Sequence, residues 1–236
     1  MRRIFIALFS VVVMGLPVNA SVWVASDRVP SIGTIIVKKN SLPDNIQFKT
    51  VNAPSDNRYA IAANTIQINS ADLIYTSNDH EVAYVISREI GEIIVKNINP
   101  KSKFYSSKEI DAMGIDLMIN SGYNPLAGIA VNAKMSDLDS ERVQYIYDYL
   151  SYNYPSKIVS GYNSQEYTSF LNNIQPQLKE RSLDKKKLKR FNKSQTKINT
   201  NRLKHFAKFN PQYSRLSDWN ITYELLLSIT EPEDKN

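Results

Sequence analysis

The stretch from Asn78 to Ile98 constrains the fold of this chain more than any other. Valine and isoleucine recur along it at helical spacing, at positions 82, 85, 86, 93 and 94. Asn78 and Glu81, three residues apart, form a capping box that predicts the start of a helix. In the middle of the apolar run stand the residues REIGE at 88–92, which bring three charges into a helix that otherwise reads as buried.

The rest of the chain predicts strands before this helix and more helices after it. Strands are expected at 46–51, 59–61 and 65–69. In the strand at 65–69, isoleucine alternates with polar residues, as on a half-buried edge. A β-like run also stands at 35–37. Helices are expected at 107–120, 126–133, 137–152 and from about 167 to the proline at 176. We therefore predict an α+β fold, with a small antiparallel sheet packed on a helical bundle in which the 78 and 107 helices lie side by side.

The N-terminus has the order of a secretory signal peptide. Two arginines precede an apolar run at 4–16, and small residues follow at 18 and 20. The run is short for a membrane span, so we predict a signal peptide at 1–20, cleaved after Ala20. The protein is then expected to be periplasmic or secreted, and membrane-associated if the signal stays uncleaved.

Few residues of this chain bind transition metals. The sequence has no cysteine and two histidines, His80 and His205. Disulfides and thiolate metal sites are therefore excluded, and a site that needs two or three imidazoles cannot be assembled locally. His80 is expected to be solvated at the helix start, and His205 lies in a basic stretch without a partner motif. The net charge of +6 permits anionic partners without requiring them.

The REIGE segment stands where a zinc peptidase carries His-Glu-x-x-His. Two histidines four residues apart on a helix can bind one zinc ion, and the glutamate between them can take a proton from the zinc-bound water. Four segments follow one another at short spacing: NRYA at 57–60, the strand at 65–69, EVAYVISREIGEI and DAMGIDLMINSGYNP. This order resembles the gluzincin peptidases of metallopeptidase family 48, the group of the CAAX prenyl proteases and of the HtpX and BepA types, over about 46–133.

Position by position, the resemblance implies that the metal site has been lost. The two histidine ligands fall on Arg88 and Glu92, and the third ligand, a glutamate, falls on Ser107. The catalytic base falls on Glu89 and a supporting aspartate on Asp111, and both of these are retained. Arginine cannot donate a lone pair to a metal, so we expect no bound metal and no cofactor, although the family uses zinc.

Two interpretations of Arg88 stand side by side. It forms either an exposed i,i+4 pair with Glu92, or a buried cluster in which its guanidinium replaces the charge of zinc beside Glu89 and Asp111. In the first case the change Arg88→Ala costs less than about 1 kcal/mol. In the second it costs roughly 3–5 kcal/mol, because carboxylates are left unpaired. For Glu89 a structural role is favoured over that of a surviving general base.

These readings predict an exported metallopeptidase-like protein without catalysis, which binds a peptide or protein of the cell envelope. The domain is expected at 21–178. The bound peptide would add as a strand beside Thr65, Ile66, Gln67 and Ile68. The alternative of another class is an active hydrolase that uses Glu89 and Asp111 as paired carboxylates.

A third candidate function concerns the C-terminal part. Residues 179–236 form a basic extension, with lysine and arginine dominant at 179–208 and an apolar stripe near 216–227 that predicts a terminal helix. Such a stretch could bind an anionic polymer or lipid, and its other interpretation is a solvated segment. It carries no signature of a nucleic-acid fold, so no specific nucleic-acid partner is expected.

Overall fold

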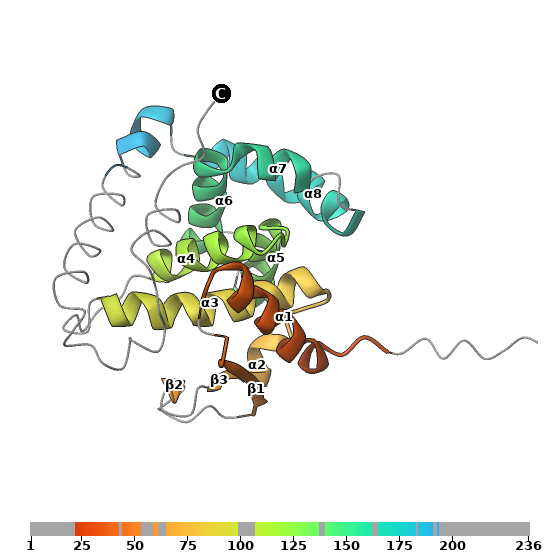
Figure 1. Cartoon of the computed structure of the whole chain (residues 1–236). Coiled ribbons are helices and arrows are strands. Elements are labelled where there is room, and N and C mark those ends of the chain that lie inside the picture. Colours follow the sequence, from red (N-terminus) through yellow and green to blue (C-terminus); the bar gives the residue numbers. More distant parts are fainter. Residues whose placement is uncertain are drawn as a thin grey trace, which may run out of the picture.

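The computed structural model describes residues 22–42, 44–52, 59–60, 65–98, 107–136, 140–161, 165–182, 184–190 and 193. Within them the protein is mostly helical with a small sheet, an α+β arrangement (Figure 1). The predicted signal peptide, its cleavage site and the predicted terminal helix lie outside the described residues. The elements are α1 (Ala25–Lys39), β1 (Gln47–Val51), β2 (Tyr59–Ala60), β3 (Thr65–Asn69), α2 (Ser70–Leu73), α3 (Asp79–Ile98), α4 (Ser107–Asn120), α5 (Leu126–Met135), α6 (Glu141–Asn153), α7 (Pro155–Gly161) and α8 (Gln165–Arg181).

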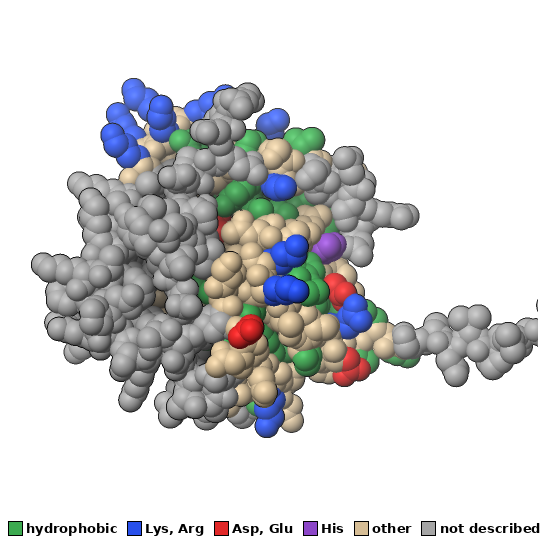
Figure 2. Space-filling view, viewed as in Figure 1, with side chains coloured by type: hydrophobic (Ala, Val, Ile, Leu, Met, Phe, Trp, Pro, Cys, Tyr) green, Lys and Arg blue, Asp and Glu red, His purple; other side chains and the backbone are tan. Residues whose placement is uncertain are grey.

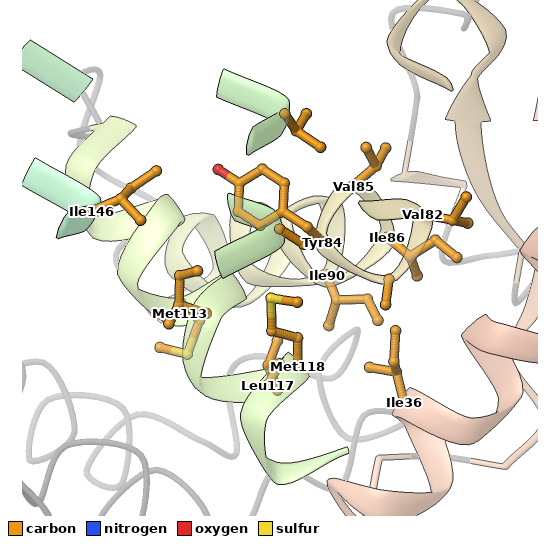
Figure 3. Packing of buried hydrophobic residues seen from close by; sticks show 14 of the residues in the cluster. Ile36, Val82, Tyr84, Val85, Ile86, Ile90, Met113, Leu117, Met118 and Ile146 are labelled. Atoms are coloured by element: carbon orange, nitrogen blue, oxygen red, sulfur yellow. The ribbon is translucent and has the colours of Figure 1, made fainter. Parts of the chain in front are cut away.

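The central helix α3 begins and packs as the sequence predicts. The Glu81 backbone N–H donates to the Asn78 side-chain oxygen at 3.0 Å, and the Glu81 carboxylate accepts the Ser77 N–H at 2.7 Å. The first bond satisfies a donor that the first turn of a helix leaves unpaired, and the second returns from Glu81 to the residue before Asn78, one position earlier than in a standard capping box. The predicted stripe is buried: Val82, Val85, Ile86, Ile93 and Ile94. Figure 3 shows Val82, Val85 and Ile86 among the packed core side chains.

The sheet is mixed, and the prediction of an antiparallel sheet is wrong for its main pairing. β1 pairs with β3 in parallel over five residue pairs, from Gln47 opposite Thr65 to Val51 opposite Asn69. β2 pairs with β3 antiparallel at two positions only. The order β1-β3-β2 places β3 in the centre of the sheet and not at an edge. Alternation of apolar residues fixes the two faces of a strand but carries no information on the direction of its neighbour.

The β-like run at 35–37 lies inside helix α1, so that prediction is also wrong. Three adjacent β-branched residues favour a strand locally. Ile32 and Ile36, one helical turn apart, are however 2% and 0% exposed, and their burial outweighs the local preference. Gly33 stands on the same side, where a Cβ atom would come within 2.6 Å of the Phe48 ring of β1. The missing side chain therefore lets α1 pack closely on the sheet.

Helices α3 and α4 cross at two glycines, which confirms that these helices lie side by side. A Cβ atom on Gly114 would lie 2.9 Å from the Cα of Arg88. A Cβ atom on Gly91, the glycine of the REIGE segment, would lie 3.1 Å from the Ile110 carbonyl oxygen. The two backbones therefore lie close together where the helices cross.

The final described helices depart from the expected boundaries. α8 continues through Pro176 to Arg181, although the proline was expected to end it. Leu178 is fully buried, and its carbonyl accepts a hydrogen bond of 3.0 Å from the Gln144 side chain of α6, which fixes the last turns of α8. The domain boundary expected after residue 178 thus falls within a helix. Among the described residues, no helix is both long and apolar enough to cross a membrane.

Candidate functional site

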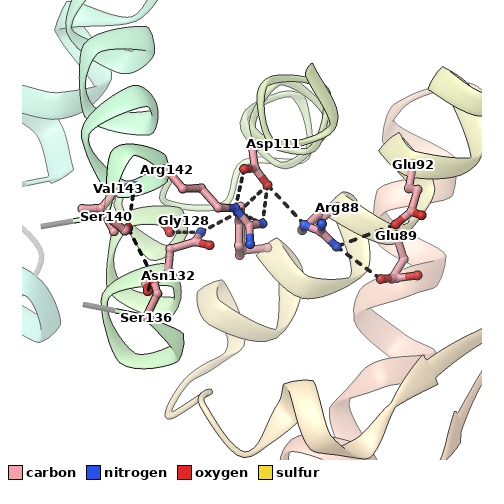
Figure 4. A network of polar contacts seen from close by, with 11 residues as sticks. Arg88, Glu89, Glu92, Asp111, Gly128, Asn132, Ser136, Ser140, Arg142 and Val143 are labelled. Carbon is pink, nitrogen blue, oxygen red and sulfur yellow. Dashed lines mark hydrogen bonds and ion pairs between the residues drawn. The ribbon is translucent and has the colours of Figure 1, made fainter. Parts of the chain in front are cut away.

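The residues of the REIGE segment meet Asp111 in a charged cluster between α3 and α4. Arg88 Nε donates to Asp111 Oδ1 at 3.2 Å, and Arg88 Nη1 lies 3.6 Å from Glu89 Oε1 and 3.8 Å from Glu92 Oε2 (Figure 4). The Asp111 side chain is fully buried, and that of Arg88 is 25% exposed. The interpretation of Arg88 as the centre of a carboxylate cluster is confirmed for these contacts.

A second arginine, which the sequence analysis missed, completes the cluster. Arg142 of α6 binds both carboxylate oxygens of Asp111 through Nε and Nη2, each at 2.5 Å. Burial alone lowers the pKa of Arg142, but the hydrogen bonds and the charge of Asp111 outweigh it and the pKa is raised. A signal for this role exists: Arg142 precedes the buried Ile146 by one helical turn, so both stand on one face of the predicted helix.

Polar groups from α3 and α5 extend the cluster into the core. The Tyr84 hydroxyl donates to Asp111 Oδ1 at 3.1 Å and accepts from Asn132 Nδ2 at 2.7 Å. Asn132 Nδ2 also donates to the Gly128 carbonyl at 2.7 Å, which orients its amide. Burial and the charge of Asp111 raise the pKa of Tyr84, so the phenol stays protonated as a donor. Asp111 therefore accepts hydrogen bonds from helices on two sides.

The cluster separates the two carboxylates that were considered as a catalytic pair. The guanidinium of Arg88 lies between Glu89 and Asp111, within ion-pair distance of both (Figure 4). The Glu89 side chain is 4% exposed and that of Glu92 is 16% exposed. Ser107 lies on the surface as the first residue of α4. A general acid and base need access to a shared substrate or water, and an arginine occupies that place.

The donor set does not fit a zinc ion. In the part of the chain that the structure describes, no group of three or more histidine, aspartate or glutamate side chains is arranged to hold a metal. Of the three positions that the resemblance assigns to ligands, one is an arginine, which is always protonated, and one is an exposed serine. The positive charge beside Asp111 comes from guanidinium groups, which bind carboxylates directly.

A second buried acid lies on another face of α4. Asp116 is 3% exposed and accepts hydrogen bonds from the Tyr149 hydroxyl, at 2.7 and 2.8 Å, and from the Tyr154 hydroxyl at 2.6 Å. Burial raises the pKa of Asp116 to about 8, against the smaller lowering by the two phenols. This carboxyl is therefore largely protonated at neutral pH.

The strand expected to bind a peptide is enclosed over part of its length. Thr65 and Ile66 of β3 pair with β1 on one side and with β2 on the other. Within the described residues, Gln67 and Ile68 pair with β1 alone. The side chains of Ile66 and Ile68 are buried, whereas Thr65 and Gln67 are half-buried on the opposite face. A peptide that adds on the β2 side of β3 would therefore have to displace β2 at Thr65 and Ile66.

The comparisons with known proteins assign no family. No match to the chain is found among protein-family models, among curated proteins or among solved structures. The functional argument therefore rests on the geometry of the cluster and of β3.

Proposed function

We propose that the protein is a metallopeptidase-like chain of the gluzincin type whose metal site has become an arginine-carboxylate cluster. In this proposal it is exported, does not catalyse hydrolysis, and binds a peptide or protein in the cell envelope. The observation that carries the proposal is the convergence of Arg88 and Arg142 on the buried carboxylate of Asp111. A catalytic metal cannot share this place with two guanidinium groups, because like charges repel strongly in the protein interior.

In this proposal the cluster has a mechanical role. It ties α3 to α4 and α6, and α3 packs against β3. The strand is thereby held in place on a rigid helix pair. An extended segment that pairs with Gln67 and Ile68 gains main-chain hydrogen bonds, while the surrounding surface selects its side chains. Binding without cleavage is the activity that this arrangement supports.

The loss of the metal site is tested by metal analysis of the purified protein after exposure to zinc. We expect no stoichiometric zinc and no cleavage of casein. The triple variant Arg88→His, Glu92→His, Ser107→Glu should gain zinc binding, because it restores two imidazoles one turn apart and a carboxylate at the start of α4. Tight zinc binding by the wild type that disappears in Glu92→Ala refutes the proposal. Casein cleavage that disappears in Glu89→Gln favours the hydrolase alternative.

Peptide binding is tested with peptides selected from an unbiased displayed library. A selected peptide is then synthesised in two forms, N-methylated at odd or at even positions. Strand addition predicts that one form loses binding and the other keeps it, because alternate N–H groups of a strand face its partner. Equal binding of both forms, or no selected peptide at all, contradicts binding at β3. This chemistry leaves the protein unchanged, so misfolding cannot imitate the result.

A second candidate function has a specific observation in its favour. The short helical segment at 185–190 exposes five cationic side chains, and its Leu188 is buried. Figure 2 shows a group of blue side chains projecting at the upper left. Such a surface attracts anionic polymers or lipids. Binding to an anionic polymer that weakens steeply with salt, and that is lost on deletion of 179–208, would support this function.

A further inference from the structure

The helical turn at 185–190 has a defined start and a defined inner side. The Lys187 backbone N–H donates to the Asp184 side chain at 2.9 Å, and the Leu188 N–H donates to the Asp184 carbonyl at 3.0 Å. These two bonds cap a helix. Leu188 is 7% exposed, so the side of the turn that carries it does not face solvent. The directions of the other side chains follow from this geometry.

The cations of this turn gather on one side of it. At about 100° per residue, four of the five share an arc of about 140° around the helix axis: Lys185, Lys186, Lys189 and Arg190. We call these four residues the cationic face. The buried Leu188 lies outside the arc. Along the axis, Lys185 and Lys189 are about 6 Å apart, as are Lys186 and Arg190.

The cationic face is unpaired within the described part of the protein. Its four side chains are exposed, and among the described residues none of them forms an ion pair or a hydrogen bond. Lys187, outside the arc, does form an ion pair, with its Nζ 3.5 Å from Asp184 Oδ2. The exposed Arg28 likewise pairs with Asp79. The cations of the face therefore differ from these paired cations on the same surface.

This arrangement is unfavourable for the turn itself. Like charges one helical turn apart repel each other, and cations in the first turn meet the positive end of the helix dipole. Lys185 and Lys186 are subject to both effects, because they are the first residues of the turn. An anion bound across the face would offset this repulsion, which no carboxylate among the described residues does.

The composition of the turn favours a linear polymer over a membrane as the source of that anion. A helix that lies on a bilayer inserts exposed apolar side chains below its cations. Here Leu188 is buried, and the exposed residues at 185–190 are all cationic. Two pairs of cations at an interval of about 6 Å suit a chain that carries one charge per repeat, such as a phosphodiester backbone.

We propose that the cationic face binds a linear phosphodiester polyanion through its backbone charges. This inference rests on the second candidate function above, and it names the ligand and the residues. The lysines act as point charges, and the Arg190 guanidinium can donate two parallel hydrogen bonds to one phosphate. No aromatic side chain is present among the described residues 184–190, so bases are not stacked and binding is independent of base sequence.

The test uses the folded full chain and a fluorescent oligothymidylate of about 20 nucleotides, longer than the segment that the face can cover. Binding is followed by fluorescence anisotropy over a series of salt concentrations. For single strands, log K changes with log[salt] by about −0.7 for each phosphate neutralised. Four contacts therefore predict a slope of about −3 or steeper.

Matched variants assign this slope to the face. Lys186→Gln and Lys189→Gln should each make the slope shallower by about 0.7, and the double variant by about 1.4. Lys187→Gln removes the same charge from the same turn, but outside the arc, and should leave the slope unchanged. All three side chains are exposed, so none of these changes is expected to unfold the protein.

Three results would overturn the inference, and they bear differently on the second candidate function. An equal effect of Lys187→Gln and Lys189→Gln would show general attraction, and that function would stand if deletion of 179–208 still abolished binding. Binding to vesicles of phosphatidylcholine and phosphatidylglycerol, without binding of oligothymidylate, would assign a lipid as the partner. Binding of neither probe would refute both the inference and the function on which it rests.

Discussion

Replacing each of the two arginines that share Asp111 tests whether the cluster acts as one unit. Arg142 gives Asp111 two hydrogen bonds at 2.5 Å, whereas Arg88 gives one at 3.2 Å. When Arg88 is lost, Asp111 keeps Arg142 and the Tyr84 hydroxyl. We therefore expect Arg88→Met to cost about 1 kcal/mol, less than the 3–5 kcal/mol that a sole partner would imply. Arg142→Met should cost about 2–3 kcal/mol.

The double variant leaves a fully buried carboxylate without a cation, so its cost should exceed the sum of the two single costs. We expect about 5 kcal/mol in urea unfolding, with a coupling of more than about 1 kcal/mol. Methionine keeps the packing of the arginine stem and removes every donor. Adding Asp111→Asn to the double variant should recover about 2–3 kcal/mol, because it removes the buried charge.

The exposed Arg28, which pairs with Asp79 at the surface, is the matched control. Its change to methionine should cost less than the change at Arg142, because solvent screens the pair. Additive costs at Arg88 and Arg142, within about 0.5 kcal/mol, would show that the two arginines do not share Asp111 and would refute the reasoning.

Three further predictions concern the helix crossing, the second buried acid and the N-terminus. Gly114→Ala should destabilise the protein by about 1–3 kcal/mol, because its Cβ atom would meet the Arg88 backbone, which cannot move aside as a side chain can. An unchanged midpoint of urea unfolding would contradict the close crossing. Burial raises the pKa of Asp116 to about 8. Between about pH 4 and pH 8 the unfolded chain has therefore released a proton that the folded protein keeps. The free energy of unfolding consequently falls as the pH rises through this range. Asp116→Asn should abolish this slope and stabilise the protein at pH 8 by about 2–5 kcal/mol, and a slope that survives the change would exclude Asp116 as its source. Mass spectrometry of exported protein should find Ser21 as the first residue, and an intact Met1 would show that the signal is not cleaved.

The sequence predicted those features that depend on local periodicity and capping. The start of α3, its buried stripe and the bounds of α4 follow from the capping box at Asn78 and from apolar spacing. The β-like run at 35–37 was misread because strand propensity is weaker than the burial of a helical face. The direction of β1 relative to β3 depends on how the chain crosses between them, which no local pattern encodes.

At the candidate site, the sequence predicted the partners of Arg88 but not Arg142. Arg88, Glu89 and Glu92 are neighbours on one helix, so their proximity follows from helical geometry. The contact between Arg142 and Asp111 joins residues 31 positions apart, on helices whose relative placement depends on the whole core. The helical spacing of Arg142 and Ile146 places the arginine on the buried face of its helix, but no local pattern indicates that Asp111 is the acid it meets.

The glycine crossing of α3 and α4 separates the spacing of these helices from the chemistry between them. Gly91 and Gly114 set the approach of the two backbones through steric contact, which does not depend on charge or on a bound ion. Side chains one turn before and after the crossing can then be exchanged without moving the helices that carry them. The helix pair therefore serves as a fixed frame whose spacing does not depend on which charged side chains it carries.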